Sequence, residues 1–320
     1  QILQNGICLS SFLDSLRDYH DFHIHDIRLI AILGTLWRPN MRKKTPIQKI
    51  ISYIFLILLA YIMIYPLLWM IGAAFKTNDE IFGTIGILPK NPVFGAFEAG
   101  WKGTGKYGFS TFLLNSMLLV IPTVFFTVLS STLVGYGFAR FEFPFKKALF
   151  ILMLSTLMLP STVIIIPRYI LFKKFGWLDS YMPFWMPALF ACSSFFNYMM
   201  VQFFRGLPRE LDESAKIDGC NSLKILCRIL LPLCKAAIFS VIVFQFVWTW
   251  NNFLEVLIYI NSVDKFPVAL GLRMTMDIGA EFDWNQIMAM SIVAIAPPVI
   301  LFFAAQKYFV EGIATTGMKN

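Results

Sequence analysis

The chain has 320 residues, of which 58% are apolar and only 14% are charged, and its mean hydropathy is +0.67. These values exclude a soluble domain of average composition, in which about 25% of the residues are charged. The formal net charge of +8 is not gathered into a basic aromatic surface, so we expect no nucleic-acid partner. The length leaves room for about six membrane spans of about twenty residues, which predicts an all-α membrane protein.

The segment before the first span is predicted to be an N-terminal extension, residues 1–45, outside the core of the protein. Met41 and the three basic residues after it look like a natural start, so residues 1–40 are expected to be an upstream addition. His20, His23 and His25 have metal-like spacing, but no predicted fold surrounds them. We therefore expect no metal site.

Six apolar segments are long enough to cross a bilayer as helices. The predicted spans are 51–75, 111–138, 148–166, 183–204, 236–259 and 286–305. If these spans alternate across the membrane, about 16 Lys and Arg fall on the side of both termini and about 9 on the other side. Positive loops face the cytoplasm, so both termini and the loop between the fourth and fifth spans are predicted to be cytoplasmic. Residues 46–307 form the predicted transmembrane domain, and residues 308–320 form a cytoplasmic tail.

Residues 100–106 fit the first seven positions of a phosphate-binding P-loop. The next position requires Ser or Thr as a ligand for Mg²⁺, and Tyr107 occupies it. No apolar strand precedes Gly100, as a P-loop requires. We therefore expect this segment to bind no nucleotide.

The most specific motif lies in residues 205–232, between the fourth and fifth spans. Glu213–Gly219 reads Glu-Ser-Ala-Lys-Ile-Asp-Gly, and after nine further residues Ile229–Pro232 reads Ile-Leu-Leu-Pro. Acidic residues early in this segment favour a helix N-terminus, and Gly219 tolerates the positive φ that ends a helix. A second helix is predicted to start at Asn221 or Ser222. The alternative is an ordinary charged loop between membrane helices.

This pattern resembles the EAA loop of ABC importer permeases, which reads Glu-Ala-Ala, two variable residues, Asp-Gly, nine variable residues and Ile-x-Leu-Pro. Ser214 replaces one alanine of that pattern. Residues 135–144 are similar to the first cytoplasmic turn of carbohydrate-type permeases, and residues 306–317 to the C-terminus of the second permease subunit of maltose and oligosaccharide importers. The resemblance implies a core of six transmembrane helices, with residues 205–232 as a cytoplasmic coupling helix-turn-helix.

The resemblance also implies the function, which is transport and not catalysis. The chain would be a multi-pass permease subunit in a bacterial cell membrane, passing a mono- or oligosaccharide inward. Its partners would be a second, non-identical permease, two cytoplasmic ATPase subunits and an extracytoplasmic sugar-binding protein. The ATPase subunits would bind ATP and Mg²⁺, and this subunit would hold no cofactor. A permease for a non-sugar small polar solute is the alternative. The residues that match the coupling motif are Glu213, Ser214, Ala215, Asp218 and Gly219.

The fifth predicted span carries a candidate substrate pathway, because polar side chains within a span usually face a cavity or the bundle interior. The candidates are Gln245, Trp248, Thr249, Asn251, Asn252 and Glu255. At about 100° per residue, all of them except the flanking Asn251 fall within roughly a third of the helix circumference. Aromatic faces can stack on a sugar while amides and a carboxylate bond its hydroxyls. The alternative is an interfacial belt of Trp248 and Trp250, with the polar side chains bonding neighbouring helices.

Weaker candidates are polar residues of the second and fourth spans, for which close helix packing is the favoured role. They are Asn115, Ser116, Ser130, Ser131, Thr132 and Asn197. Two other function classes lack support in the sequence. A membrane enzyme needs clustered acids, histidines or a nucleophile, and a secondary transporter needs inverted repeats or buried ionisable groups. Glu255 is the only clear acid within a predicted span.

Overall fold

The computed structural model describes residues 46–103, 106–277 and 283–317, and all regular structure in these ranges is helical. This confirms the predicted all-α class. The chain divides into two compact units, residues 1–65 and 66–320. Helix α2 (Pro46–Ala73) runs across this boundary and contains Pro66. The N-terminal extension and its histidines lie outside the described residues.

Four helical segments in the described ranges are long and apolar enough to cross a membrane. They are α2, α5 (Phe109–Arg140), the segment Met182–Arg205 that contains α8 (Met182–Leu189) and α9 (Ser194–Arg205), and the part Trp284–Lys307 of α16 (Trp284–Gly317). Two further candidates are bent pairs. Helices α6 (Lys146–Leu157) and α7 (Ser161–Lys174) meet at 108°, and the segment Ser222–Leu233 meets α13 (Lys235–Trp250) at 79°. Six spans are therefore reached only if each bent pair counts as one span.

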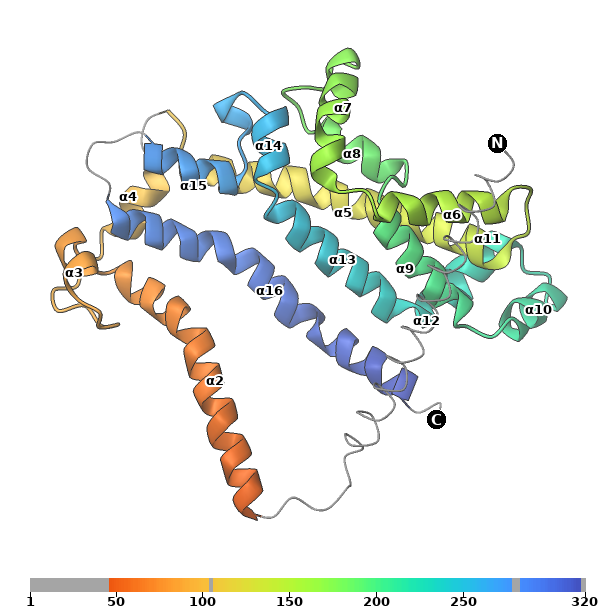
Figure 1. Cartoon of the computed structure of the whole chain (residues 1–320), viewed down its shortest axis with the longest axis horizontal. Helices are drawn as coiled ribbons and strands as arrows, with labels where there is room; N and C mark the ends of the chain where they lie inside the picture. The colour runs from red at the N-terminus through yellow and green to blue at the C-terminus, as the bar shows by residue number, and fades with distance from the viewer. Residues whose placement is uncertain (1–45, 104–105, 278–282, 318–320) are drawn as a thin grey trace, which may run out of the picture. The chain divides into compact units, whose positions relative to one another are not determined.

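Shorter elements connect these helices. They are α3 (Asn78–Gly83), α4 (Ala96–Lys102), α10 (Glu210–Ile217), α11 (Ser222–Ile225), a π-helical turn (Leu226–Leu230), α12 (Leu231–Leu233), α14 (Leu254–Tyr259), a 3₁₀ turn (Val263–Lys265) and α15 (Val268–Asp277). Helix α5 packs against α8, α9, α13 and α15, and α13 lies between α5 and α16 (Figure 1). Helix α5 is thus the central element of the second unit.

Close packing of α5 on α9 depends on Gly135. A Cβ atom at this position would lie 2.6 Å from the Cβ of Met200 and 3.0 Å from its carbonyl carbon. Real Cβ atoms do not approach so closely, so a larger residue would push the two helices apart. By contrast, a Cβ atom at Gly137 would meet nothing within 4 Å.

Three of the predicted spans are interrupted. The predicted fourth span, 183–204, breaks between α8 and α9, at residues 190–193. The predicted third span, 148–166, breaks between α6 and α7 at Pro160, which has no N–H to continue the helical hydrogen bonds. The predicted fifth span, 236–259, ends at Trp250, and α14 begins only at Leu254. The side chain of Asn252 accepts a hydrogen bond from the backbone N–H of Glu255 at 3.3 Å, which competes with helix continuation. The prediction that Gln245 and Glu255 share one continuous helix is therefore wrong.

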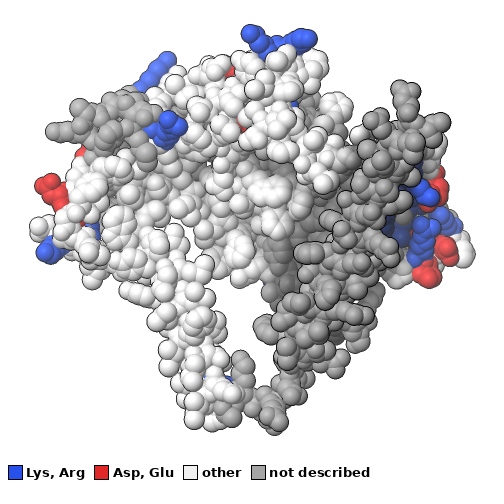
Figure 2. All heavy atoms as spheres, viewed as in Figure 1, with Lys and Arg blue, Asp and Glu red and all other residues white. Residues whose placement is uncertain are grey.

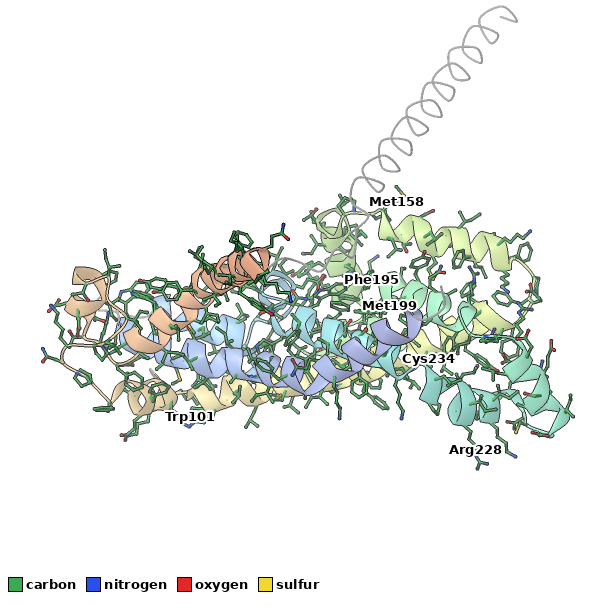
Figure 3. The ribbon with its side chains drawn as sticks, turned by 90° about the horizontal axis from the view of Figure 1, so that it is seen from below. Trp101, Met158, Phe195, Met199, Arg228 and Cys234 are labelled. Atoms are coloured by element: carbon green, nitrogen blue, oxygen red, sulfur yellow. The ribbon has the colours of Figure 1, made fainter. Side chains whose placement is uncertain are left out.

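The surface of the second unit suits a bilayer. Charged side chains gather over its ends, near α3 and α4 and near α10, and Lys and Arg side chains also stand at the top of the view, over α7; the surface between the ends and below α7 is broadly uncharged (Figure 2). Trp101 of α4 and Arg228 of the π-helical turn mark these opposite ends (Figure 3). Large apolar side chains such as Phe125 and Phe303, 62% and 61% exposed, cover the faces between the ends. Lipid is the solvent that makes such exposure favourable.

Candidate functional site

The EAA loop, residues 205–232, folds as the predicted helix-turn-helix. Helix α10 ends at Ile217, and Gly219 turns the chain with a φ of 76°. Helix α11 begins at Ser222, where the side chain of Asn221 accepts the backbone N–H of Lys224 at 2.8 Å. This bond satisfies a helix N-terminus that would otherwise lack a partner. The local sequence therefore predicts the turn correctly.

The predicted coupling residues lie on different sides of this loop. Ala215 is 5% exposed and packs in the cluster that includes Phe204 and Ile225, so only a small side chain fits there. Glu213, Ser214, Asp218 and Gly219 are exposed. Two large apolar side chains are exposed beside them, Ile217 at 87% and Leu223 at 63%. Lys216 and Lys224 are exposed as well, so the exposed side of the EAA loop is a mixed apolar and charged surface.

A buried ion pair fixes the EAA loop to the end of α5. The Nε of Arg140 lies 3.1 Å from Oδ2 of Asp212, and their side chains are 7% and 10% exposed. Arg140 also donates through Nη2 to the carbonyl oxygens of Leu207 and Pro208, at 3.1 and 3.4 Å. The Tyr136 hydroxyl donates to the carbonyl of Ser222 at 3.1 Å. The last turns of α5 therefore hold both helices of the EAA loop.

The sequence does not reveal this ion pair, because its two partners are far apart in the chain. The one signal is that Arg140 lies in the segment 135–144, which resembles the first cytoplasmic turn of carbohydrate-type permeases. A cavity of about 120 Å³ lies beside the pair and is lined also by Glu213 and Lys216.

A polar pocket of about 370 Å³ lies among α5, α7, α8, α13 and α14. Its lining includes five of the six residues predicted for the substrate pathway: Gln245, Trp248, Thr249, Asn252 and Glu255. Asn251 is outside the lining, and its side chain donates back to the carbonyl of Val247 at 3.0 Å. The break between α13 and α14 still brings Glu255 to the same cavity as Gln245. The other nine lining residues were not among the predicted pathway residues, and five of them carry polar or thiol side chains: Thr123, Thr127, Arg168, Cys192 and Ser193.

The pocket is crossed by a short polar network. Arg168 Nη1 lies 3.0 Å from Oε1 of Glu255, and Asn252 donates to Oε2 of Glu255 at 2.9 Å. Gln245 donates to the hydroxyl of Thr249 at 2.7 Å. Both carboxylate oxygens of Glu255 are thus engaged. In the sequence, Arg168 is a charged residue directly after the apolar segment 163–167. The predicted third span ends at residue 166, so the prediction leaves Arg168 outside the membrane segments.

The two tryptophans of α13 have different roles. Trp248 is 49% exposed, lines the pocket and lies 5.2 Å, centroid to centroid, from the rings of both Phe195 and Phe196. Trp250 is 7% exposed, and its Nε1 donates to the carbonyl of Ala294 at 3.1 Å. Trp250 therefore joins α13 to α16, and the alternative that placed it in an interfacial belt is wrong.

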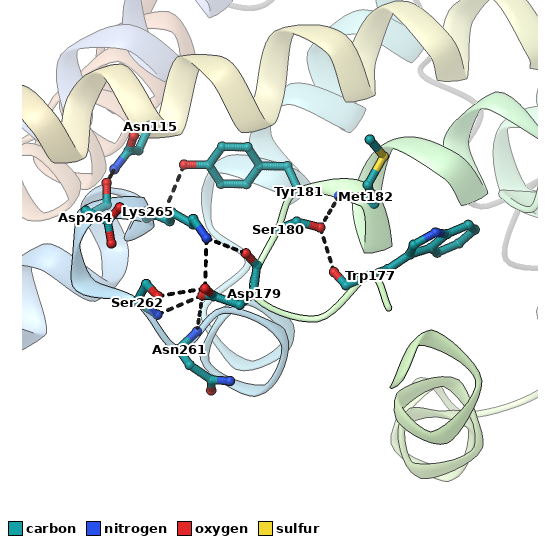
Figure 4. A network of polar contacts seen from close by, with 10 residues as sticks. All are labelled: Asn115, Trp177, Asp179, Ser180, Tyr181, Met182, Asn261, Ser262, Asp264 and Lys265. Carbon is teal, nitrogen blue, oxygen red and sulfur yellow. Dashed lines mark hydrogen bonds and ion pairs between the residues drawn. The ribbon is translucent and has the colours of Figure 1, made fainter. Parts of the chain in front are cut away.

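A second polar network positions α14, which carries Glu255 (Figure 4). The carboxylate of Asp179 accepts hydrogen bonds from Lys265 at 2.8 Å, from the backbone N–H and hydroxyl of Ser262 and from the backbone N–H of Asn261. The backbone N–H of Asp179 donates to the carbonyl of Tyr259, the last residue of α14, at 2.7 Å. The loop before α8 is thereby tied to the segment after α14.

These contacts perturb both charged groups, which lie outside the membrane-spanning segments. The hydrogen bond from Lys265, followed by that from Ser262, holds the pKa of Asp179 well below its ordinary value. The same bond to Asp179 raises the pKa of Lys265. The pair is therefore charged throughout the neutral range.

Four of the six weaker candidates of the second and fourth spans bond the backbone of other segments, while Ser131 bonds the carbonyl of Val128 within α5. Asn115 donates to the carbonyl of Asp264 at 2.6 Å, and the hydroxyl of Ser116 accepts the backbone N–H of Val268 at 2.8 Å. Ser130 donates to the carbonyl of Ala188 at 2.7 Å. Asn197 forms a similar bond to the backbone of the loop before α9. These bonds hold helices and loops together, as helix packing predicts.

The P-loop-like segment does not form a phosphate loop in the part that the structure describes. Gly100 to Lys102 belong to α4, and a Cβ atom at Gly100 would lie 2.9 Å from Cγ of Met290. This glycine serves helix packing. In the described ranges no three His, Cys, Asp or Glu side chains are grouped closely enough to hold a metal ion.

The known proteins that this chain resembles are membrane components of binding-protein-dependent transport systems or transport system permeases. Residues 131–315 match the family described as binding-protein-dependent transport system inner membrane component. The arabinooligosaccharides transport system permease protein of Halalkalibacterium halodurans is 32% identical over 87% of this chain and 99% of that protein. The sn-glycerol-3-phosphate transport system permease protein of Agrobacterium fabrum is 28% identical, over 86% of this chain and 99% of the relative.

Two further matches agree with these. The trehalose/maltose transport system permease protein of Thermococcus litoralis is 27% identical over 86% of this chain and 98% of its own length. A crystal structure of a bacterial ABC transporter involved in the import of the acidic polysaccharide alginate covers 83% of this chain and 98% of the matched chain. It has a TM-score of 0.73 at 20% sequence identity, so it shows a shared fold.

Proposed function

The chain belongs to the family of binding-protein-dependent transport system inner membrane components, and we propose that it passes a mono- or oligosaccharide into a bacterial cell. It is a permease subunit of an ABC importer and not an enzyme. Relatives named for arabinooligosaccharides and for trehalose and maltose support the carbohydrate. The relative named for sn-glycerol-3-phosphate supports the second candidate, a non-sugar small polar solute.

Two cytoplasmic ATPase subunits would drive the transport by binding ATP and Mg²⁺, so this chain needs no cofactor of its own. A second, non-identical permease would complete the pathway, and an extracytoplasmic binding protein would deliver the sugar. Residues 46–307 would be the permease domain, residues 308–320 a cytoplasmic tail, and residues 1–45 an extension without a part in transport. Both termini and the EAA loop would face the cytoplasm.

The observation that carries this proposal is the anchored EAA loop. Its outer side exposes Ile217 and Leu223, apolar side chains that a cytoplasmic subunit can cover. Its inner side is fixed to α5 by the buried Arg140–Asp212 pair. A movement of the ATPase subunits would therefore pass directly into the central helix.

Helix α5 connects the loop to the pocket. Thr123 and Thr127 of α5 line the pocket, and Arg140 of the same helix holds the EAA loop. A shift or tilt of α5 driven from the loop would change the pocket, which is the requirement for alternating access. Glu213, Ser214, Asp218 and Gly219 would lie at the ATPase contact, and Ala215 would keep the loop closely packed.

The experiment that tests the proposal uses the chain purified with the products of its neighbouring genes and reconstituted in liposomes. Uptake that requires ATP, together with ATP hydrolysis that rises when one sugar-loaded binding protein is added, is the expected result. Uptake that an ionophore abolishes while ATP is held constant would instead indicate a secondary transporter.

The pathway residues are tested by single alanine substitutions of Gln245, Asn252 and Glu255, which line the pocket. We expect each to change the apparent affinity or the rate of uptake. Asn251→Ala is the matched control, because Asn251 lies on the same segment but outside the pocket lining. Equal uptake in all four variants and the wild type would remove the pocket from the pathway.

A further inference from the structure

The polar pocket contains one cation and one anion, and they neutralise each other. We infer that the pocket selects an uncharged polyhydroxylated solute, and that Glu255 sets this selectivity by occupying Arg168. The inference rests on the proposed function, because it names the chemical class of the solute that this permease passes. It goes beyond that function by assigning the specificity to one ion pair.

The charge of the pocket follows from its lining. Arg168 and Glu255 are the only charged residues among the fourteen that line it. Their side chains are 38% and 26% exposed, so both face the open space, and the joined atoms are 3.0 Å apart. A solute in the pocket therefore meets a dipole with no net charge. All its other polar contacts come from neutral groups, among them the side chains of Gln245 and Asn252.

The ion pair is held in place from both sides. Asn252 donates to the second carboxylate oxygen of Glu255 at 2.9 Å, so that carboxylate is fixed between an amide and a guanidinium. The Asp179 network ties the end of α14 to the loop that follows α7, the helix that carries Arg168. An anionic solute would need an available cation to offset its loss of hydration. Arg168 is already engaged.

The relatives do not decide between the two solute classes. One is named for arabinooligosaccharides, which are uncharged, and another for sn-glycerol-3-phosphate, which is an anion. The pocket volume of about 370 Å³ lies near the lower end of the range for small-ligand sites. Trp248 supplies a half-exposed aromatic face on which a sugar ring can stack. The neutral pair and the aromatic face together favour an uncharged sugar.

Cys192, an exposed native cysteine in the pocket lining, allows a direct measurement of the local charge. The other four cysteines are replaced with alanine, and the full complex is purified in detergent. Cys192 is then modified with anionic, cationic and neutral methanethiosulfonates. The rate of modification by each reagent is divided by the rate at which the same reagent reacts with a small thiol in solution. A second version that keeps only Cys227, exposed on the EAA loop, is the control for general effects on thiol reactivity.

We expect the anionic and cationic reagents to modify Cys192 of the wild type at normalised rates within about threefold of each other. A unit charge at 10 Å changes the local concentration of a monovalent ion by roughly 4- to 16-fold for effective dielectric constants of 40 to 20. Glu255→Gln should therefore raise the ratio of anionic to cationic rates at least about tenfold, and Arg168→Gln should lower it as much. The double variant should return to the wild-type ratio, and Cys227 should respond to none of these changes.

The solute class is measured in the same complex by protection of Cys192 from the neutral reagent. Maltotriose should protect it better than trigalacturonate, a trisaccharide of three uronic acids, and Glu255→Gln should reverse this order. An unchanged rate ratio in Glu255→Gln, a wild-type ratio far from one, or failure of every reagent to reach Cys192 would overturn the inference. Equal or better protection by trigalacturonate, or no protection by either sugar, would also overturn it. None of these results changes whether an ATPase co-purifies with the chain. The proposed function is therefore tested independently of this inference.

Discussion

The ion pair between Arg140 and Asp212 gives the sharpest energetic prediction. Replacing Asp212 with Leu, or Arg140 with Met, leaves one buried charge without its partner. Breaking such a pair costs about 3–5 kcal/mol of folding free energy. The neighbouring cavity of about 120 Å³ can admit water to the remaining charge, so we expect the lower end, about 3 kcal/mol for each single substitution.

The double variant separates the ion pair from the two side chains. Apolar residues of similar volume can replace a buried pair at little cost, so Arg140→Met with Asp212→Leu should be more stable than either single variant. Two quantities are measured. The first is the thermal unfolding temperature of the purified complex, and the second is the number of ATP molecules hydrolysed per solute transported. The double variant should be more stable than either single variant. It should still hydrolyse more ATP per solute transported than the wild type, because the bonds from Arg140 to Leu207 and Pro208 are lost.

Lys102→Met is the matched control. Lys102 and Glu98 form an ion pair at 2.7 Å on α4, but their side chains are 73% and 74% exposed. Water and salt screen such a pair, so the substitution should cause no measurable change in unfolding. Single Arg140 and Asp212 variants as stable as this control would refute the account of how the EAA loop is held.

Three more predictions follow from the structure. Gly135→Ala should lower the unfolding temperature because its Cβ would overlap α9, whereas Gly137→Ala, with open space around it, should raise or preserve that temperature; equal effects would contradict the packing argument. Asp179→Asn should destabilise the complex by the same amount at every pH from 5 to 8. The contacts that lower the pKa of Asp179 stabilise the folded state, and this stabilisation is fully present above the ordinary pKa of an Asp side chain. That difference should shrink below about pH 4, and a difference that changes between pH 6 and 8 would implicate another group. Gly219→Leu should cut uptake while membrane insertion persists, because a φ of 76° costs a branched side chain about 1–2 kcal/mol; normal uptake would contradict a coupling role for the turn.

The features that the sequence predicts well are local. The turn at Gly219 and the start of α11 depend on residues within a few positions, and the structure confirms both. Helix α5, predicted as 111–138 and observed as Phe109–Arg140, is a long, predominantly apolar segment with no charged residue before Arg140, and its ends are marked by a glycine and an arginine. Hydrophobic length and capping chemistry therefore suffice for these elements.

The features that the sequence misses depend on contacts between distant segments. The apolar pattern continues beyond Trp250, so it cannot reveal that Asn252 ends the regular helix and that Glu255 turns toward Arg168 of another helix. The pairing of Arg140 with Asp212 likewise joins residues that no spacing rule connects. Five of the six predicted pathway residues line the pocket, because polar side chains are rare in these segments, but the prediction placed them on one helix, whereas they lie on α13, on α14 and in the break between them.

The central claim, that the EAA loop is the contact to an ATPase, is tested most directly by site-specific cross-linking. Cys227 is itself exposed on the EAA loop, so each single-cysteine variant is made in a chain whose five native cysteines are replaced with alanine. Ile217→Cys then places a single thiol at the tip of the loop, where the native side chain is 87% exposed. Leu88→Cys is the control, because Leu88 is 83% exposed in the connection between α3 and α4, away from the EAA loop. The account predicts that a thiol-to-amine cross-linker joins the Ile217→Cys variant to the ATPase subunit, and that nucleotide changes the yield, while Leu88→Cys gives no such product. Cross-links to the ATPase from Leu88→Cys and none from Ile217→Cys would contradict it.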